Sequence, residues 1–168
     1  SHCPGSNLRL GSGVARIREL LDAGAPVSLA VDGSASNDVN HMLAEARMML
    51  LLARTRSKKH WLAAEEVWRA ATSGGARVLG RKAMGVIEVG ALADLVLWDL
   101  ETLDLAGAQS DPLAAMLFSA AAPRAHTVLV DGKAVVEEGR IPGFDEAAQV
   151  RAHNATARRL LEKAGSPA

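Results

Sequence analysis

The sequence predicts an α/β protein in which helix–strand–helix units come first, and antiparallel strands with covering helices follow. A short apolar segment at residues 27–31 lies between two stretches with the apolar spacing of amphipathic helices. Further along, two β-branched runs are separated by Asp131-Gly132, which predicts a hairpin with a type I′ turn. The character of the chain changes near Gly80. We therefore expect two parts, residues 1–80 and residues 81–168.

The first part follows the order helix, buried strand, polar loop, helix. Residues 14–23 carry apolar side chains at helical spacing. Residues 27–31 contain few polar side chains and end at Asp32, which is typical of a strand buried on both faces of a parallel sheet. Turn-forming residues 33–38 then lead into a helix expected over residues 40–54. This alternation is typical of β/α units.

The second part has different local signals. A helix over residues 62–71 is the last element before the change. Residues 94–98 indicate a strand, and residues 127–136 the hairpin. Asp111 followed by Pro112 is a typical helix start, with Asp at the N-cap and Pro at the first helical position. Residues 145–163 predict a final amphipathic helix.

Composition narrows the class of protein. The chain has 168 residues, 49% of them hydrophobic, with 19 basic and 19 acidic side chains. This balance gives no electrostatic argument for nucleic acid or an anionic membrane as a partner, and the longest apolar runs are too short to cross a bilayer. One cysteine, Cys3, fits a reducing compartment, so we expect the cytoplasm. The loop-like opening Ser1–Asn7 without an initiator Met predicts a segment of a longer chain.

Asp32 is the most informative single position. It lies where the buried strand ends and the polar loop begins, and in parallel β/α folds the carboxyl ends of the strands form the active face. A carboxylate there can ligate a metal or move a proton. A helix-capping or turn aspartate is the alternative. In the same loop, Ser36 and Asn37 can either hydrogen-bond a polar heterocycle or cap the next helix.

The histidine and cysteine residues give no further indication of a metal or catalytic site. The five histidines are scattered, and the sequence contains no H-x-H, C-x-x-C or H-E-x-x-H pattern. His2 and Cys3 stand together near the start of the chain, but without a local signature for metal binding or nucleophilic catalysis. We therefore expect structural or surface roles for these side chains.

Five segments, in order along the chain, resemble the cytosine/guanine-deaminase-like branch of the amidohydrolase superfamily. The second of them is especially similar to 8-oxoguanine deaminases. The segments are SHCPGSNLRLGSG (residues 1–13), VDGSASND (31–38), ATSGGARVLGR (71–81), GVIEVGALADLVLWDL (85–100) and VLVDGKAVVEEGRI (128–141).

The resemblance implies a fold and a site. Residues 1–80 would supply strands 7 and 8, with their helices, from the C-terminal part of a TIM-type (β/α)8 barrel. Residues 81–168 would supply part of a small β-sandwich domain and a C-terminal helix. Asp32 matches the family aspartate that binds one divalent metal, Zn or alternatively Fe, and handles protons in catalysis. Ser36 and Asn37 fall in the loop that lines the substrate pocket.

The same resemblance implies what this chain lacks. The family's H-x-H motif and the histidines after strands 5 and 6 have no counterpart here, so we expect an incomplete metal site and no activity from this chain alone. The favoured substrate is a small nitrogen heterocycle, of the 8-oxoguanine or guanine type, deaminated by a full-length protein that forms a homo-oligomer. Two alternatives stay open: a triazine-type aminohydrolase or chlorohydrolase, and a non-catalytic β/α remnant.

Overall fold

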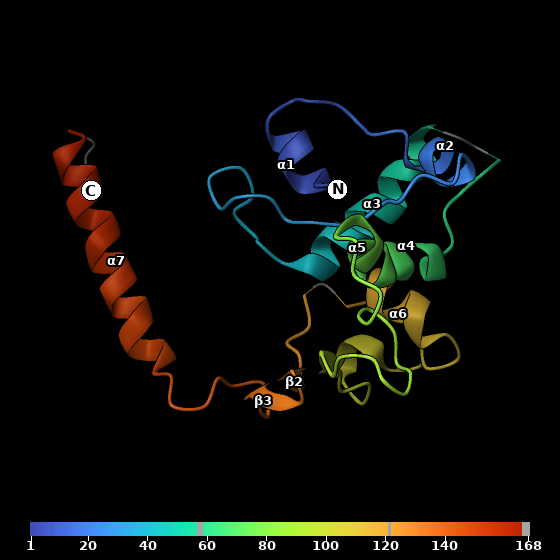
Figure 1. Ribbon diagram of the computed structural model, residues 1–168. Coiled ribbons are helices and arrows are strands. Elements are labelled where there is room, and N and C mark those ends of the chain that lie inside the picture. The colour runs from blue at the N-terminus through green and yellow to red at the C-terminus, as the bar shows by residue number, and fades with distance from the viewer. Residues whose placement is uncertain (57–58, 121, 166–168) are drawn as a thin grey trace.

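The computed structural model describes residues 1–56, 59–120 and 122–165. Within these residues, six helices gather around one apolar core, a small sheet lies beside them, and a seventh helix stands apart (Figure 1). The chain is thus α/β, as the sequence predicts. In chain order, the helices are α1 (Pro4–Arg9), α2 (Ile17–Asp22), α3 (Met42–Arg56), α4 (Ala64–Ala71), α5 (Ser73–Val78), α6 (Pro112–Phe118) and α7 (Glu146–Lys163).

Helix α3 lies at the centre of the core. It packs against α1, α4 and α6, and its residues Met49 and Leu50 are almost completely buried. Val67 of α4 and Leu117 of α6 close around them and are equally inaccessible. These apolar side chains recur at helical spacing, which is why the sequence predicts α2, α3 and α4 to within a few residues of their ends. Apolar burial of this kind is the main stabilising contribution to the fold.

Helix α1 corrects one sequence expectation. Residues 1–7 look like a loop, yet α1 begins at Pro4, whose ring fixes the backbone near helical φ. The Cys3 side chain makes no capping hydrogen bond to the helix. The Gly5 amide instead donates to a carboxylate oxygen of Glu45 in α3, 2.8 Å away. A six-residue helix has little intrinsic stability, so α1 depends on this tertiary contact, which local sequence does not reveal.

The apolar segment at residues 27–31 is extended but makes only a minimal strand. It pairs in parallel with the chain start through a single bridge between His2 and Leu29. The His2 amide donates to the Ser28 carbonyl over 2.8 Å, and the Ala30 amide donates to the His2 carbonyl over 2.9 Å. The Leu29 amide bonds to the carbonyl of Ala70 in α4 instead of a second strand. The predicted buried, parallel arrangement is therefore confirmed, while the ladder is shorter than a regular strand.

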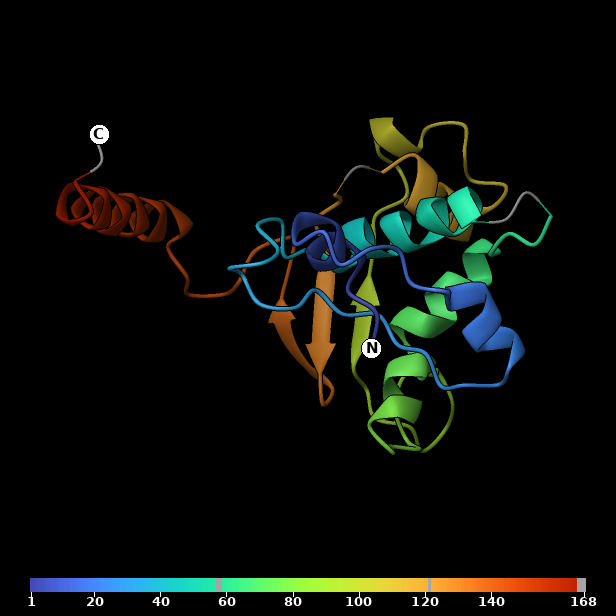
Figure 2. The same cartoon turned by 90° about the horizontal axis from the view of Figure 1, so that it is seen from above.

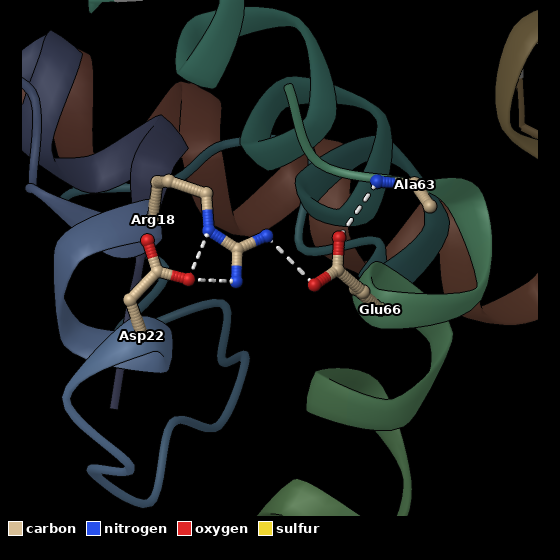
Figure 3. Close-up of polar contacts among 4 residues, drawn as sticks. All are labelled: Arg18, Asp22, Ala63 and Glu66. Atoms are coloured by element: carbon tan, nitrogen blue, oxygen red, sulfur yellow. Dashed lines mark hydrogen bonds and ion pairs between the residues drawn. The ribbon is translucent and has the colours of Figure 1, made fainter. Parts of the chain in front are cut away.

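An ion-pair network joins α2 to α4 (Figure 3). The Arg18 guanidinium contacts Asp22 on its own helix and reaches Glu66 on α4, with an N–O distance of 2.7 Å to Glu66. The other carboxylate oxygen of Glu66 accepts from the Ala63 amide over 2.9 Å and so caps the start of α4. One carboxylate thereby fixes both a helix end and the position of α2.

The sheet forms a meander of three short antiparallel strands in the order β1-β2-β3. The strands are β1 (Leu95–Leu97), β2 (Thr127–Val130) and β3 (Lys133–Val136). Asp131 and Gly132, between β2 and β3, have φ angles of 51° and 73°. Positive φ at both central residues is the requirement of a type I′ turn, so the predicted hairpin is confirmed.

The remaining elements follow their capping signals. The Asp111 carboxylate accepts from the Ala114 amide over 3.0 Å at the start of α6, as Asp-Pro predicts. A short 3-10 helix, η1 (Leu103–Leu105), was not predicted.

Helix α7 starts with an N-cap at Asp145, contains no buried residue, and stands away from the helical cluster in both views (Figures 1 and 2). None of the described helices is long and apolar enough to cross a membrane.

Candidate functional site

The two parallel segments end at the same edge, and polar side chains follow each of them. The first segment continues from His2 into α1, which carries Ser6. The second continues from Leu29 to Asp32. The Ser6 hydroxyl donates to Oδ2 of Asp32 over 2.5 Å and so connects the two segments beyond their last backbone contact. This edge is where the carboxyl ends of parallel strands place functional groups.

Asp32 is exposed and adopts a conformation that is uncommon for its residue type. Its φ angle is 64°, in the left-handed region where aspartate is tolerated better than most side chains. Its Oδ1 accepts from the Gly33 amide over 2.8 Å, and its Oδ2 accepts from the Ser36 hydroxyl over 3.0 Å as well as from Ser6. The carboxylate is therefore held in a defined orientation facing solvent.

The same hydrogen bonds keep Asp32 ionised. The Ser6 hydroxyl contributes most to lowering the pKa of the Asp32 carboxyl, followed by the Gly33 amide. The Ser36 hydroxyl lowers this pKa further, because all three donors stabilise the charged form. An ionised carboxylate at an open edge can ligate a cation or accept a proton.

Ser36 and Asn37, the other two predicted site residues, have different surroundings. The Ser36 hydroxyl lies within reach of both Asp32 Oδ2 and the Gly33 carbonyl, at 3.0 and 3.1 Å. Since one hydroxyl hydrogen serves one acceptor well, the Ser36 oxygen keeps lone pairs available to a ligand. Asn37 is buried, and both amide hydrogens are used, on the Val31 carbonyl at 2.8 Å and on Glu45 at 2.9 Å. In the structure, Ser36 therefore contacts Asp32, whereas the side-chain amide of Asn37 points into the protein interior.

Glu45 is the residue near this site that the sequence did not indicate. It lies on α3 at a position that helical spacing assigns to the core, and only 1% of its surface is exposed. A carboxylate in an apolar stripe is the signal that would have found it, because buried acidic side chains are rare unless they have partners. Its partners are the Gly5 amide and the Asn37 amide group.

His2 and Cys3 border the same region, and burial changes the pKa of each side chain. Burial lowers the pKa of His2, and the nearby Glu45 carboxylate only partly opposes this shift. Burial also raises the pKa of the Cys3 thiol, and the carboxylates of Asp32 and Glu45 raise it further. Cys3 therefore lacks the lowered pKa of a nucleophilic cysteine.

The carboxylate oxygens of Asp32 are suited to bind a divalent metal ion. Oδ1 accepts one hydrogen bond, so a lone pair remains on a solvent-facing, ionised oxygen. This is a suitable donor for Zn²⁺. In the part of the chain that the structure describes, no group of three or more His, Cys, Asp or Glu side chains is placed to hold a metal ion. Asp32 thus fits as one ligand of a metal site and does not form a site by itself.

Comparison with known proteins decides the family. Residues 1–135 match the model of the amidohydrolase family. The chain belongs to the amidohydrolase family. The resemblance seen in the sequence is therefore confirmed, and the fold is that of an amidohydrolase segment with a small three-stranded sheet, consistent with part of a barrel.

Two curated relatives of this amidohydrolase segment are deaminases. The 8-oxoguanine deaminase of Pseudomonas aeruginosa is 45% identical over 160 residues, which cover 95% of this chain and 35% of that protein. The 5-methylthioadenosine/S-adenosylhomocysteine deaminase of Pelotomaculum thermopropionicum is 40% identical over 147 residues, covering 87% of this chain and 34% of that protein. The chain spans about a third of the length of these relatives.

Two solved structures with zinc share this amidohydrolase fold. Atrazine chlorohydrolase from Arthrobacter aurescens TC1, complexed with zinc, gives a TM-score of 0.85 at 38% identity, over 92% of this chain and 34% of that one. An adenosine deaminase from Xanthomonas campestris with bound zinc gives a TM-score of 0.86 at 34% identity, over 94% of this chain and 36% of that one.

Proposed function

We propose that this chain is the C-terminal part of a metal-dependent hydrolase that cleaves a C–N bond of a cyclic amidine-type heterocycle. An 8-oxoguanine or guanine-type ring is the favoured substrate, supported by the identity of 45% to an 8-oxoguanine deaminase. The observation that carries the proposal is Asp32: exposed, ionised and oriented by hydroxyl donors at the edge where the two parallel segments end.

The whole protein would carry one divalent metal, with zinc favoured by the solved relatives and iron as the alternative. The metal would supply Lewis-acid activation of water for attack on the ring carbon. Asp32 would hold one coordination position through Oδ1, while Ser6 and Ser36 fix Oδ2. As an ionised carboxylate, Asp32 would also accept a proton and pass it to the departing ammonia.

Ser36 and Asn37 are assigned to the substrate-binding loop. The Ser36 hydroxyl is close enough to Asp32 to contact a ring bound beside it. With both amide hydrogens of Asn37 engaged inside the protein, its contribution would come through the shape of the loop that it anchors to Val31. Ring substrates of this kind present donors and acceptors that hydroxyl groups can match.

The organisation of the whole protein is part of the same proposal. Residues 1–80 would contribute strands 7 and 8 of a (β/α)8 barrel, and residues 81–168 part of a small β domain with covering helices. Exposed large apolar side chains, such as Ile87, Val89 and Leu103, support further chain packing on this segment. We assign the protein to the cytoplasm and propose a homo-oligomer.

A triazine ring is the second candidate substrate. The specific observation in its favour is the TM-score of 0.85 and 38% identity to atrazine chlorohydrolase. Both chemistries displace a leaving group from an electron-poor ring carbon. Substrate choice between them depends on a few pocket side chains, so both rings belong in the same assay.

The test uses the protein expressed from the complete reading frame that contains these residues. Metal content and turnover of 8-oxoguanine, guanine and atrazine are measured for the wild type and for Asp32→Asn. We expect about one zinc or iron per chain and ammonia release from a purine, both lost in Asp32→Asn. The matched control is Asp38→Asn, in the same loop, whose carboxylate pairs with Arg9 and not with the site.

Three results would overturn the proposal: no bound metal, no turnover of any ring substrate, or full activity in Asp32→Asn. Residues 1–168 purified alone give a further check. We expect neither zinc binding nor turnover from them, because Asp32 is one ligand where a catalytic zinc takes three from the protein. Turnover by the isolated segment would contradict the assignment as part of a larger site.

A further inference from the structure

Glu45 is a buried carboxylate that neither the family assignment nor the proposed chemistry uses. No ion pair of Glu45 is found within residues 1–56, 59–120 and 122–165, although only 1% of its surface is exposed. Placing an ionisable group in the interior without a cation is unfavourable unless hydrogen bonds satisfy it. Its hydrogen-bond partners therefore indicate what it does.

One oxygen of Glu45 holds the start of α1. Oε2 accepts from the Gly5 amide over 2.8 Å, in the first turn of a helix that the Cys3 side chain leaves uncapped. A Cβ atom added at Gly5 would lie 2.4 Å from Oε1, so the carboxylate sits directly against this glycine. Glu45 thus caps α1 from a different helix, and α1 carries Ser6, the strongest donor to Asp32.

The other oxygen holds the segment that leads into Asp32. Oε1 accepts from the Asn37 amide group over 2.9 Å, and the same amide group donates to the Val31 carbonyl over 2.8 Å. Val31 is the residue immediately before Asp32. Glu45 therefore contacts both segments that meet in the hydrogen bond between Ser6 and Asp32.

We propose that Glu45 is a positioning residue that sets the orientation of Asp32, by fixing α1 with Ser6 on one side and the Asn37-anchored loop on the other. This inference rests on the proposed function, because Asp32 matters chemically only if it ligates the metal. Both groups that hydrogen-bond to Glu45 are donors, so a side chain that accepts at both of its terminal atoms is required. Glutamine would present its own amide hydrogens to one of these donors and lose that contact.

The test is a double-mutant cycle read through zinc affinity, in the protein expressed from the complete reading frame. Zinc dissociation constants are measured by chelator competition for the wild type, Glu45→Gln, Ser6→Ala and the double variant. We expect each single change to weaken zinc binding about tenfold, the range found for partners of metal ligands. We expect the double variant to fall well short of the roughly 100-fold product, because both changes act on Asp32.

Controls separate positioning from general destabilisation. Met49→Ala removes a buried side chain one turn along α3 and should lower the melting temperature without changing zinc affinity. Turnover gives a second readout: Glu45→Gln should lower kcat and leave KM nearly unchanged, because Glu45 does not reach the substrate. Glu45→Asp, which keeps an acceptor-only group, should recover more zinc affinity than Glu45→Gln does.

Unchanged zinc affinity in Glu45→Gln, full multiplicativity of the cycle, or an equal loss in Met49→Ala would overturn the inference. If Glu45→Gln does not fold, Gly5→Ala replaces it, since the added methyl group displaces the carboxylate without changing charge. If the wild type binds no zinc, the proposed function fails separately. In that case, crystal structures of the wild type and of Glu45→Gln test the positioning role alone. An intact contact between Ser6 and Asp32 in the variant would contradict positioning by Glu45.

Discussion

The Ser6 hydroxyl and the Asp32 carboxylate lie 2.5 Å apart, although 26 residues separate them in the chain. Ser6 is buried in the first turns of α1, whereas Asp32 is exposed at the end of an extended segment. This contact joins a fixed donor to a solvent-facing acceptor. It helps to orient the one carboxylate on which the proposed chemistry depends, and it is the largest cause of the lowered pKa of that carboxyl.

Removing the Ser6 hydroxyl should change how the metal-free chain responds to acid. A carboxyl whose pKa is lower in the folded state stabilises the fold above its ordinary pKa, and this contribution disappears as the pH falls through the folded-state value. Ser6 is the largest cause of the lowered pKa of Asp32, so Ser6→Ala should raise that pKa and shift acid unfolding to higher pH.

Carbon-13 NMR titration of the Asp32 carboxyl, together with the pH midpoint of unfolding, measures both effects. Ser34→Ala, in the same loop, serves as the control and should leave both unchanged, because Ser34 is not among the groups that shift Asp32. An Asp32 pKa that stays where it is in Ser6→Ala would show that the hydroxyl has no such role.

The backbone of Asp32 should be strained in the absence of its side-chain contacts. At φ of 64°, alanine is disfavoured by about 1–2 kcal/mol, while glycine is not. Asp32→Ala should therefore melt below Asp32→Gly, by roughly 2–8 °C for a chain of this size. Differential scanning calorimetry of the two variants measures the gap, and since both lack the carboxylate, equal melting temperatures would argue against strain.

Glu66 should matter more for stability than its neighbour Glu65. Partial burial disfavours the charge on Glu66, but the Ala63 amide and Arg18 outweigh it and lower the pKa of this carboxyl. Glu66→Ala loses the cap of α4 and the link to α2, at a cost of about 1–2 kcal/mol. Glu65→Ala removes only the exposed pair with Arg69, with a cost below about 0.5 kcal/mol.

Urea denaturation of the two glutamate variants gives the free energies of unfolding directly. Arg18→Ala should resemble Glu66→Ala, because the two side chains share one contact between α2 and α4 (Figure 3). Similar losses in Glu65→Ala and Glu66→Ala would mean that the network adds nothing beyond surface charge.

Two adjacent glycines in α5 should respond oppositely to alanine. A Cβ atom at Gly74 would lie 2.3 Å from the Val27 carbonyl oxygen and 2.9 Å from that of Arg69, and backbone atoms cannot yield easily. Gly74→Ala should therefore destabilise the chain by about 1–3 kcal/mol or more. At Gly75 nothing lies within 4 Å, so Gly75→Ala should stabilise the helix by about 0.5–1 kcal/mol. Thermal denaturation distinguishes them, and the same sign for both would contradict the close approach of α5 to residues 27–31.

The sequence predicts those elements whose stability is local. Asp111 caps α6, Asp131-Gly132 turns the hairpin, and apolar spacing defines α3, all close to where they were expected. Each of these signals acts within a few residues of the chain. The family was also recognisable, because five motifs occur in a fixed order, although no single one is decisive.

What the sequence could not provide depends on contacts between distant residues. Helix α1 packs against α3, and its Gly5 amide binds Glu45, 40 residues away. The extended segment at 27–31 forms one bridge and not a ladder, because Leu29 bonds to α4. Asp32 could be placed at the end of this segment, whereas Ser6 as its partner and the inward turn of Asn37 required three-dimensional placement.

Helix α7 has 18 residues and buries none of them, so tertiary packing within the described residues protects it little from local unfolding. A solitary helix of this length is marginal in water, so it should unwind often on its own. Its basic side chains include Arg151, Arg158 and Arg159, and trypsin cuts chains that open locally. Brief digestion should therefore release the C-terminal end first and leave the packed helices intact, so that protease sensitivity reports directly on whether another surface covers α7.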